Sequence, residues 1–284
     1  MRYIFMRFPG GKAKAVTLSY DDGKKQDKRL SDLFTANGMK CTFNLNGDAY
    51  RGQAGLSKEE VIEHILKPGH EIALHGYCHR APGGLRPLDG IKDILDNRLE
   101  LEQKYDRIIR GLAYPDFGIT RFENGASYEQ IKSYLTHLDI AYARSLGGDN
   151  NRFSMPTDWH NWVPTASHNN PKLMEWIEEF LALDIKNEGY PAAREPRLFF
   201  LWGHSYEYDD KDNWHLIETV CEKLAGHEDV WYATNMEIYE YSEAYQSLVF
   251  SADGKKVYNP TLFTLCFEVD MVAYTISPGE TITL

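Results

Sequence analysis

The stretch VTLSYDDG, residues 16–23, decides the fold class that we expect for this chain. Its apolar first half is typical of a short buried strand, and this strand leads directly into two adjacent carboxylates and a glycine. Adjacent carboxylates repel each other, so one of them would have a raised pKa in a cleft unless a cation lies nearby. The pair Asp21 and Asp22 therefore predicts a cation site at the end of a buried strand. An isolated Asp-Asp-Gly is also typical of a turn, and the rest of the chain has to decide between the two.

Strands and helices alternate along most of the chain. Apolar, β-rich runs begin near residues 15, 40, 71, 111, 140, 197 and 230, and amphipathic helical patterns lie between them. Such alternation predicts parallel strands joined by crossover helices. About seven repeats of the pattern favour a closed (β/α) barrel over an open sheet.

The residue composition and the spacing of turn residues change after about Leu248. Runs rich in Val, Thr, Phe and Tyr are interrupted there by Asp253-Gly254 and Pro278-Gly279, which are typical of turns. We therefore expect a barrel domain over residues 1–247 and a small antiparallel β appendage over residues 248–284. The appendage is either an edge hairpin that closes the end of the barrel or a separate binding module.

The composition is that of a soluble globular protein, with 43% hydrophobic and 26% charged residues among 284. No apolar run approaches the roughly 18 residues that a membrane span requires, and a net charge of −11 argues against a nucleic-acid partner. The first residues lack the pattern of a signal peptide, which predicts a cytoplasmic location, although a leader removed by processing stays open. Four widely spaced cysteines predict reduced, mostly buried thiols.

Chemically useful side chains follow the predicted strands at the ends where (β/α) barrels carry their active sites. One carboxylate and two imidazoles form the ligand set of a catalytic zinc or a similar divalent ion with an open position for water. We therefore expect Asp22, His75 and His79 to bind the metal, whose charge lets Asp21 stay ionised as a base. Taken alone, the two histidines would be typical of a solvated helix face. The side chains collected in this way are Asp21, Asp22, His75, His79, Asp116, Arg144 and His204.

Five segments of the chain resemble, in order, the five motifs of the polysaccharide deacetylases, a family of carbohydrate esterases. They are TLSYDDG (17–23), HGYCH (75–79), AYPDFG (113–118), TDW (157–159) and LFFLWGH (198–204). The resemblance implies a distorted (β/α) barrel that removes an acetyl group from an N- or O-acetylated sugar with one divalent ion. Carried over, Asp21 is the base, Asp22, His75 and His79 hold the metal, and His204 is the acid. The metal that the resemblance favours is zinc, with Co, Ni, Mn and Fe as alternatives.

The chain departs from the family pattern in its third motif. An arginine that braces the catalytic Asp usually starts this motif, but Ala113 stands at that place. Arg144 is the expected substitute, because the end of another strand could aim a guanidinium into the same mouth. His204 must be charged to act as an acid, so we expect a nearby carboxylate such as Asp158 to raise its pKa.

Aromatic and polar residues near these motifs are the expected substrate contacts, since Tyr and Trp suit sugar-binding clefts. The segment around Trp159 could instead be a packed loop. The expected substrate-binding residues are Tyr114, Pro115, Asp116, Phe117, Trp159, Trp162, His168 and Trp202.

Three other functions stay open on the sequence. The first is a hydrolase of a small non-peptide amide or a cyclic imide on the same fold, with or without metal. The second is an iron(II) oxygenase, which also uses two histidines and one carboxylate, although commonly on a β-sandwich. The third is a sugar-binding protein with a disabled site. The oligomeric state and the linkage that is cleaved are not determined by the sequence.

Overall fold

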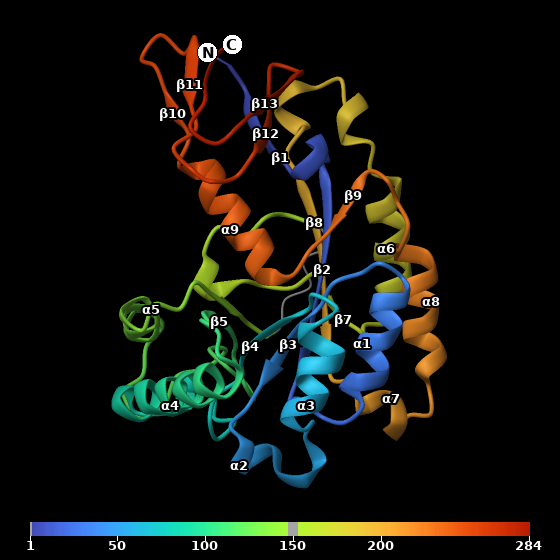
Figure 1. Cartoon of the computed structure of the whole chain (residues 1–284), viewed down its shortest axis with the longest axis vertical. Helices are drawn as coiled ribbons and strands as arrows, with labels where there is room; N and C mark the ends of the chain where they lie inside the picture. The colour runs from blue at the N-terminus through green and yellow to red at the C-terminus, as the bar shows by residue number, and fades with distance from the viewer. Residues whose placement is uncertain (1, 147–152) are drawn as a thin grey trace.

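The structure is a computed structural model that describes residues 2–146 and 153–284. Its centre is a curled sheet of parallel strands in the order β6-β5-β4-β3-β2-β8-β7, and β9 pairs with the first half of β2 (Figure 1). A parallel bridge between Arg144 and Trp162 joins β6, at one edge of this sheet, to the segment that precedes β7 at the other edge. The strands are β2 Lys14–Asp21, β3 Thr42–Leu45, β4 Glu71–Leu74, β5 Gly111–Ala113, β6 Tyr142–Arg144, β7 Ala166–Ser167, β8 Arg197–Gly203 and β9 Val230–Tyr232.

Helices connect these strands on the outside of the sheet (Figure 1). A capping box at residues 57–60 begins α3, with the Ser57 hydroxyl accepting from the Glu60 backbone N–H. The α-helices are α1 Asp27–Ala36, α2 Asp48–Arg51, α3 Lys58–Glu60, α4 Pro87–Tyr105, α5 Tyr128–His137, α6 Leu173–Ala182, α7 Glu207–Asp210, α8 Trp214–Leu224 and α9 Asn235–Gln246. The π-helix η3, Val61–Leu66, follows α3 directly. The 3-10 helices are η1 Pro9–Gly11, η2 Gly52–Ala54, η4 Pro82–Gly84, η5 Trp159–Asn161, η6 Ile185–Asn187 and η7 Pro191–Ala193.

Strand β2 is the central strand, and all eight of its residues are buried. A strand covered on both faces needs a nearly continuous apolar run, which explains why AVTL precedes the polar end of the VTLSYDDG stretch. Because the strands are parallel, their C-terminal ends meet at one end of the barrel, at the bottom of Figure 1. The predicted fold class, a distorted (β/α) barrel of about seven strands, is confirmed.

The C-terminal region forms small antiparallel sheets at the other end of the molecule, as the turn pattern predicts (Figure 1). Strand β1, Ile4–Arg7, belongs to one of them, because it pairs with β12. The buried Glu268 of β12 binds both Arg7 and Arg194, which fixes this sheet to the barrel. The division into domains at residue 248 stays a prediction. The sheets are β1-β12-β13 and β10-β11-β14, with β10 Val249–Phe250, β11 Lys256–Tyr258, β12 Leu265–Val269, β13 Val272–Ile276 and β14 Thr281–Thr283.

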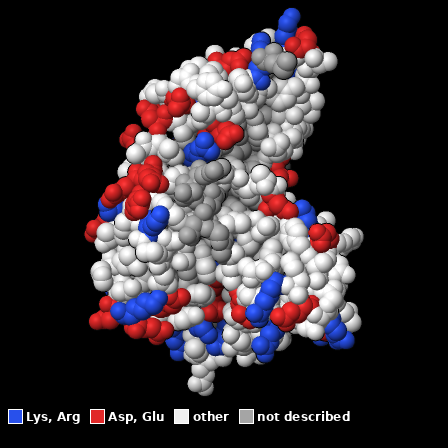
Figure 2. Space-filling model, turned by 180° about the vertical axis from the view of Figure 1, so that it is seen from behind, with Lys and Arg blue, Asp and Glu red and all other residues white. Residues whose placement is uncertain are grey.

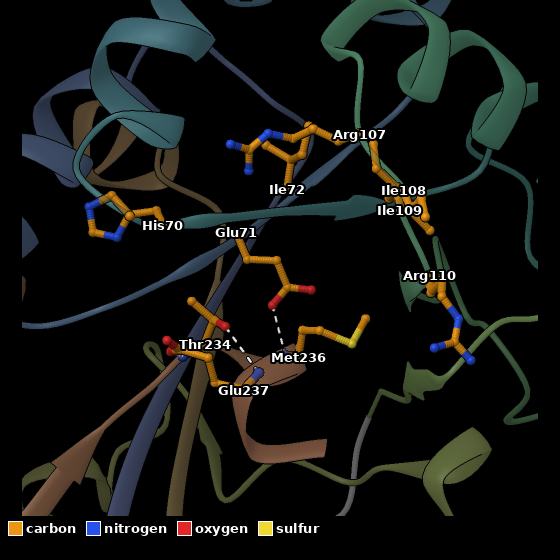
Figure 3. A pocket seen from close by; sticks show the side chains of 11 residues that line it. His70, Glu71, Ile72, Arg107, Ile108, Ile109, Arg110, Thr234, Met236 and Glu237 are labelled. Carbon is orange, nitrogen blue, oxygen red and sulfur yellow. Dashed lines mark hydrogen bonds between the residues drawn. The ribbon is translucent and has the colours of Figure 1, made fainter. Parts of the chain in front are cut away.

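The N-terminal end of the barrel strands holds a carboxylate in a network of neutral donors. Glu71 accepts hydrogen bonds from the Tyr142 hydroxyl at 2.6 Å, the Thr42 hydroxyl at 2.8 Å and the Met236 backbone N–H of α9 at 2.9 Å. Figure 3 shows this carboxylate pointing at the start of α9, inside a pocket of about 240 Å³. Burial raises the pKa of Glu71 to about 7, and the hydrogen bonds offset this increase only in part.

The surface is consistent with the acidic composition. On the face shown in Figure 2, acidic and basic side chains are interspersed, and that face carries no continuous basic surface. Within the described ranges, no helix has the length and the apolar composition that a bilayer-spanning segment requires. The four cysteines are unpaired, and three of them are buried, whereas Cys78 is exposed.

Candidate active site

Asp22, His75 and His79 come together at the C-terminal end of the barrel strands. One ligand atom from each residue can be chosen so that all three lie within 4.8 Å of one another. Asp22 Oδ1 lies 3.6 Å from His75 Nε2 and 3.4 Å from His79 Nε2. Zinc and related ions bind imidazole and carboxylate atoms at about 2.0–2.2 Å, so atoms at this mutual spacing can share one ion.

The hydrogen bonding of the cluster also fits a metal. His75 Nδ1 lies 2.9 Å from the backbone oxygen of Ala113, so this nitrogen carries the proton and Nε2 presents its lone pair to the site. Asp22 Oδ1 and His75 Nε2 are buried and have no hydrogen-bond partner in the described parts of the chain. Buried polar atoms without partners are costly, and a divalent ion would satisfy both of them.

The backbone at both ends of this cluster is strained. Asp22 has φ of 79° and His79 has φ of 53°, although neither residue is glycine. Such conformations cost about 1–3 kcal/mol each and concentrate at functional sites. Here both strained residues carry ligand atoms that lie close to His75.

Asp21 lies beside the metal cluster and is held by two donors. Its Oδ1 accepts from Asn44 Nδ2 at 2.8 Å, and its Oδ2 accepts from Arg144 Nη2 at 2.5 Å. The Asp21 Oδ2 atom also lies 3.9 Å from Nε2 of His75 and 3.9 Å from Nε2 of His204. Burial alone would raise the pKa of Asp21, but its interactions with Arg144, His75 and His204 outweigh burial and hold the pKa below its ordinary value.

Arg144 reaches Asp21 from the end of β6, as the sequence predicts for the substitute of the missing motif arginine. Its side chain is fully buried, and its guanidinium lies 4.5 Å from the ring centroid of Trp202. Ala113 is at the end of the neighbouring strand β5, directly beside Arg144 in the sheet register. The guanidinium of Arg144 therefore approaches Asp21 from the strand beside the one that carries Ala113.

His204 follows β8, and its ring is oriented by a carboxylate from the following short helix. His204 Nδ1 lies 2.8 Å from Glu207 Oε1, which leaves Nε2 directed at Asp21. Burial alone would lower the pKa of His204, but the bond to Glu207 and the charges of Asp21 and Asp22 raise it above its ordinary value. Glu207 is fixed in turn by His168, Lys211 and Asn169.

Asp158, which the sequence predicts to act on His204, has other partners. Its carboxylate accepts from the Tyr128 hydroxyl at 2.7 Å, from Lys132 Nζ at 2.7 Å and from the His160 backbone N–H at 3.0 Å. Asp158 therefore connects α5 to the start of η5. The carboxylate that forms the hydrogen bond with His204 is that of Glu207. The spacing of Glu207 three residues after His204, at the start of a helix, is the signal in the sequence that points to this pair.

The predicted substrate-binding residues fall into two groups. Trp202 packs edge-on against His204, with a centroid distance of 5.7 Å, and Asp116 is exposed on the loop after β5 in a left-handed conformation. The other aromatic residues have contacts within the fold. The Tyr114 hydroxyl donates to the His160 backbone oxygen, and the Trp159 ring N–H donates to Glu243 of α9. The Phe117 ring packs against the Arg121 guanidinium, and Trp162 and His168 are buried. Pro115 lies close to Gly76 of the loop that carries both histidines. Whether these residues contact substrate stays a prediction.

Two tyrosines that the sequence analysis does not assign to the substrate also border the site. The ring of Tyr50, from α2, stacks on His79 with a centroid distance of 5.0 Å and an interplanar angle of 5°. Tyr206 packs against His204 with a centroid distance of 5.4 Å. Both follow strands by only a few residues, which is the only trace of their position in the sequence.

Comparisons with known proteins agree with this geometry. Residues 9–122, less than half of the chain, match the family model of the polysaccharide deacetylases. No curated protein sequence matches significantly.

Solved structures of this kind share the fold at low sequence identity. A protein of Mycobacterium smegmatis described as a candidate polysaccharide deacetylase aligns with a TM-score of 0.58 and 16% identity over 87% of this chain and 96% of its own. The chitin deacetylase of Colletotrichum lindemuthianum aligns with a TM-score of 0.50 and 15% identity over 81% and 88%. A Streptococcus pyogenes deacetylase solved with acetate aligns with a TM-score of 0.39 and 14% identity. The alignment covers 45% of this chain and 54% of the length of that protein. The family match over residues 9–122 confirms the resemblance that the five motifs predict, and the Mycobacterium smegmatis structure and the chitin deacetylase share the fold of this chain.

Proposed function

We propose that this chain removes the acetyl group from an N- or O-acetylated carbohydrate. One divalent ion, for which zinc is the first candidate, is bound by Asp22, His75 and His79 in this proposal. The observation that carries the proposal is the orphaned pair of buried atoms, Asp22 Oδ1 and His75 Nε2, beside the Arg144-braced carboxylate of Asp21. A divalent ion supplies Lewis acidity to an acyl oxygen and lowers the pKa of water to about 7.

Asp21 is the base in this proposal. Arg144 and Asn44 fix both of its oxygens, and the pKa below its ordinary value keeps it ionised at neutral pH. An oriented carboxylate can take the proton of an attacking water as the carbonyl carbon becomes tetrahedral.

His204 is the acid. The Glu207 carboxylate holds the proton on Nδ1 and stabilises the charged ring, so that Nε2 can give a proton to the departing amine or alkoxide. Asp21 Oδ2 and His204 Nε2 lie 3.9 Å apart, which supports their acting on one substrate. Positioned acids and bases contribute about a hundred- to ten-thousand-fold each to the rate.

Acetate release from a panel of acetylated sugars, with and without chelator, tests the proposal. We expect release from at least one N- or O-acetylated sugar, loss of the activity with chelator, and its return on addition of zinc. Comparison with Co, Ni, Mn and Fe then identifies the most effective metal. Hydrolysis of a small amide or a cyclic imide, with no acetate from any sugar, would contradict the proposal and support the rival function.

The cytoplasmic location predicted from the sequence belongs to the same proposal. Fractionation of producing cells and detection of the protein with an antibody test it, and recovery of the protein outside the cytoplasm would contradict it.

A further inference from the structure

The rim of the site beside His79 carries two basic side chains that have no acidic partner. Lys24 comes two residues after Asp22, and Arg80 comes directly after His79, so both lie on loops that carry the proposed metal ligands. Neither forms an ion pair within residues 2–146 and 153–284, whereas Lys104 and Arg51, near the same rim, both bind Asp48. Arg80 is exposed and Lys24 is partly exposed, and cations without a partner can bind a negative group of a ligand.

Tyr50 positions these two cations relative to the cluster. The Lys24 ammonium lies 5.8 Å from the centroid of the Tyr50 ring, within the range of a cation–π interaction. The same ring stacks on His79, and 46% of Tyr50 is exposed. Arg80 follows His79 directly in the chain. Lys24 and Arg80 therefore both belong to segments that adjoin the stacked rings of Tyr50 and His79.

The loops that hold this edge are connected by backbone contacts. Lys24 forms an antiparallel bridge with Gly55, and the Lys25 N–H donates to the Ala54 oxygen at 3.1 Å. The segment that carries Tyr50 is thus attached to the loop that carries Asp22 and Lys24. This attachment limits how far Lys24 can move away from the cluster.

The negative charges nearby are mostly engaged. Asp21 binds Arg144, and Asp93 accepts from the Cys78 backbone N–H. Asp116 is exposed on the loop after β5, and its charge also acts on His79 and Tyr50. In a protein of net charge −11, Lys24 and Arg80 are therefore two cations at an edge that also carries Asp116.

We infer that Lys24 and Arg80 bind an anionic group on the acetylated substrate, a carboxylate or a phosphate, so that the preferred substrate is an acidic acetylated sugar. This inference rests on the proposed deacetylase function. Each exposed cation contributes modestly, so the loss of one should lower the preference by about 2- to 5-fold. Charges at a rim act mainly on encounter and are screened by salt.

The test compares matched acetylated oligosaccharides that are neutral, bear a carboxylate or bear a phosphate. We expect the ratio of kcat/KM for the acidic form to that for the neutral form to exceed one in the wild type. This ratio should fall about 2- to 5-fold in Lys24→Met and in Arg80→Met, through KM, and further in the double variant. Lys24→Arg should restore it, and 0.5 M salt should reduce it in the wild type. Comparison of the carboxylate and phosphate forms identifies which anion is bound.

Lys25→Met is the matched control, because Lys25 lies on the same loop but its charge acts on Glu60. Its ratio should equal that of the wild type. Binding of the deacetylated acidic oligosaccharide to the metal-free protein gives a second readout, and it should weaken in Lys24→Met and Arg80→Met but not in Lys25→Met.

Two outcomes would overturn the inference alone. One is a wild type that releases acetate from neutral and acidic sugars with equal kcat/KM. The other is a pair of variants that lose metal affinity and activity on all substrates equally, which would make Lys24 and Arg80 supports of the metal site. Absence of acetate from every sugar would instead overturn the proposed function.

Discussion

The buried carboxylates at the two ends of the barrel have pKa values that are shifted in opposite directions. At the C-terminal end of β2, Asp21 is bound by Arg144 and lies near two histidines, and its pKa is below the ordinary value. At the N-terminal end of β4, Glu71 is bound only by neutral donors, and burial raises its pKa to about 7. The difference shows that burial alone does not set the charge of an acid: a positive partner does. One end is arranged for chemistry, and the other joins strands and α9.

Asp21→Asn gives the largest expected effect on this comparison. The amide keeps the size of the side chain and can still accept from Arg144, but it cannot take a proton from water. We expect kcat to fall by about a hundred- to ten-thousand-fold while the bound metal is retained. Acetate release and metal content of the purified variant check this, and full activity would show that Asp21 is not the base.

His79→Ala tests the metal cluster at the same end of the barrel. Removal of one of three ligands should lower metal affinity by more than the roughly 10- to 100-fold that the loss of an outer partner costs. We expect the metal content to fall and activity to return only at high metal concentration. Competition with a chelator of known affinity measures the change, and an unchanged affinity would exclude His79 as a ligand.

Glu207→Gln should change the pH dependence with a smaller loss of activity. The pKa of His204 is raised in part by Glu207, and the charged ring is the form that donates a proton. Activity is therefore lost as pH rises through this pKa, and without the Glu207 charge the loss should begin at lower pH. The pH profile of kcat/KM checks this shift.

Asp158→Asn is the variant that decides which carboxylate acts on His204. Asp158 binds Tyr128 and Lys132, so its removal should leave the alkaline limb of the profile at the wild-type pH. A shift of that limb in Asp158→Asn, and none in Glu207→Gln, would reverse our assignment.

Glu71→Gln gives the smallest expected effect and concerns stability only. The pKa of Glu71 is about 7 in the folded state and about 4.5 in the unfolded state, so the folded state binds more protons between these values. The free energy of unfolding should therefore decrease as pH rises from about 4.5 through 7, by about 1–3 kcal/mol from this group. Urea denaturation at several pH values should show a flatter dependence in Glu71→Gln, and an unchanged dependence would contradict the assignment.

The sequence by itself determined the fold class and the three residues that the structure brings together as a candidate metal cluster. Strand-helix alternation depends on local periodicity, and Asp22, His75 and His79 each follow an apolar run that can be read directly from the chain. Parallel strands bring such positions to one end of a barrel whatever lies between them. The family motifs added the role expected for His204 and agreed with the role expected for Asp21.

Only the tertiary structure decided which partners these residues have. Arg144 and Asp21 are 123 positions apart, and the sequence supported this pair only as a candidate for the missing arginine. Asp158 and Glu207 were both available to His204, and the fold places Asp158 against Tyr128 and Lys132 of α5 and Glu207 against His204. Hydrogen bonds and ion pairs depend on positions within a few tenths of an ångström, which packing of distant segments sets and local sequence patterns do not encode.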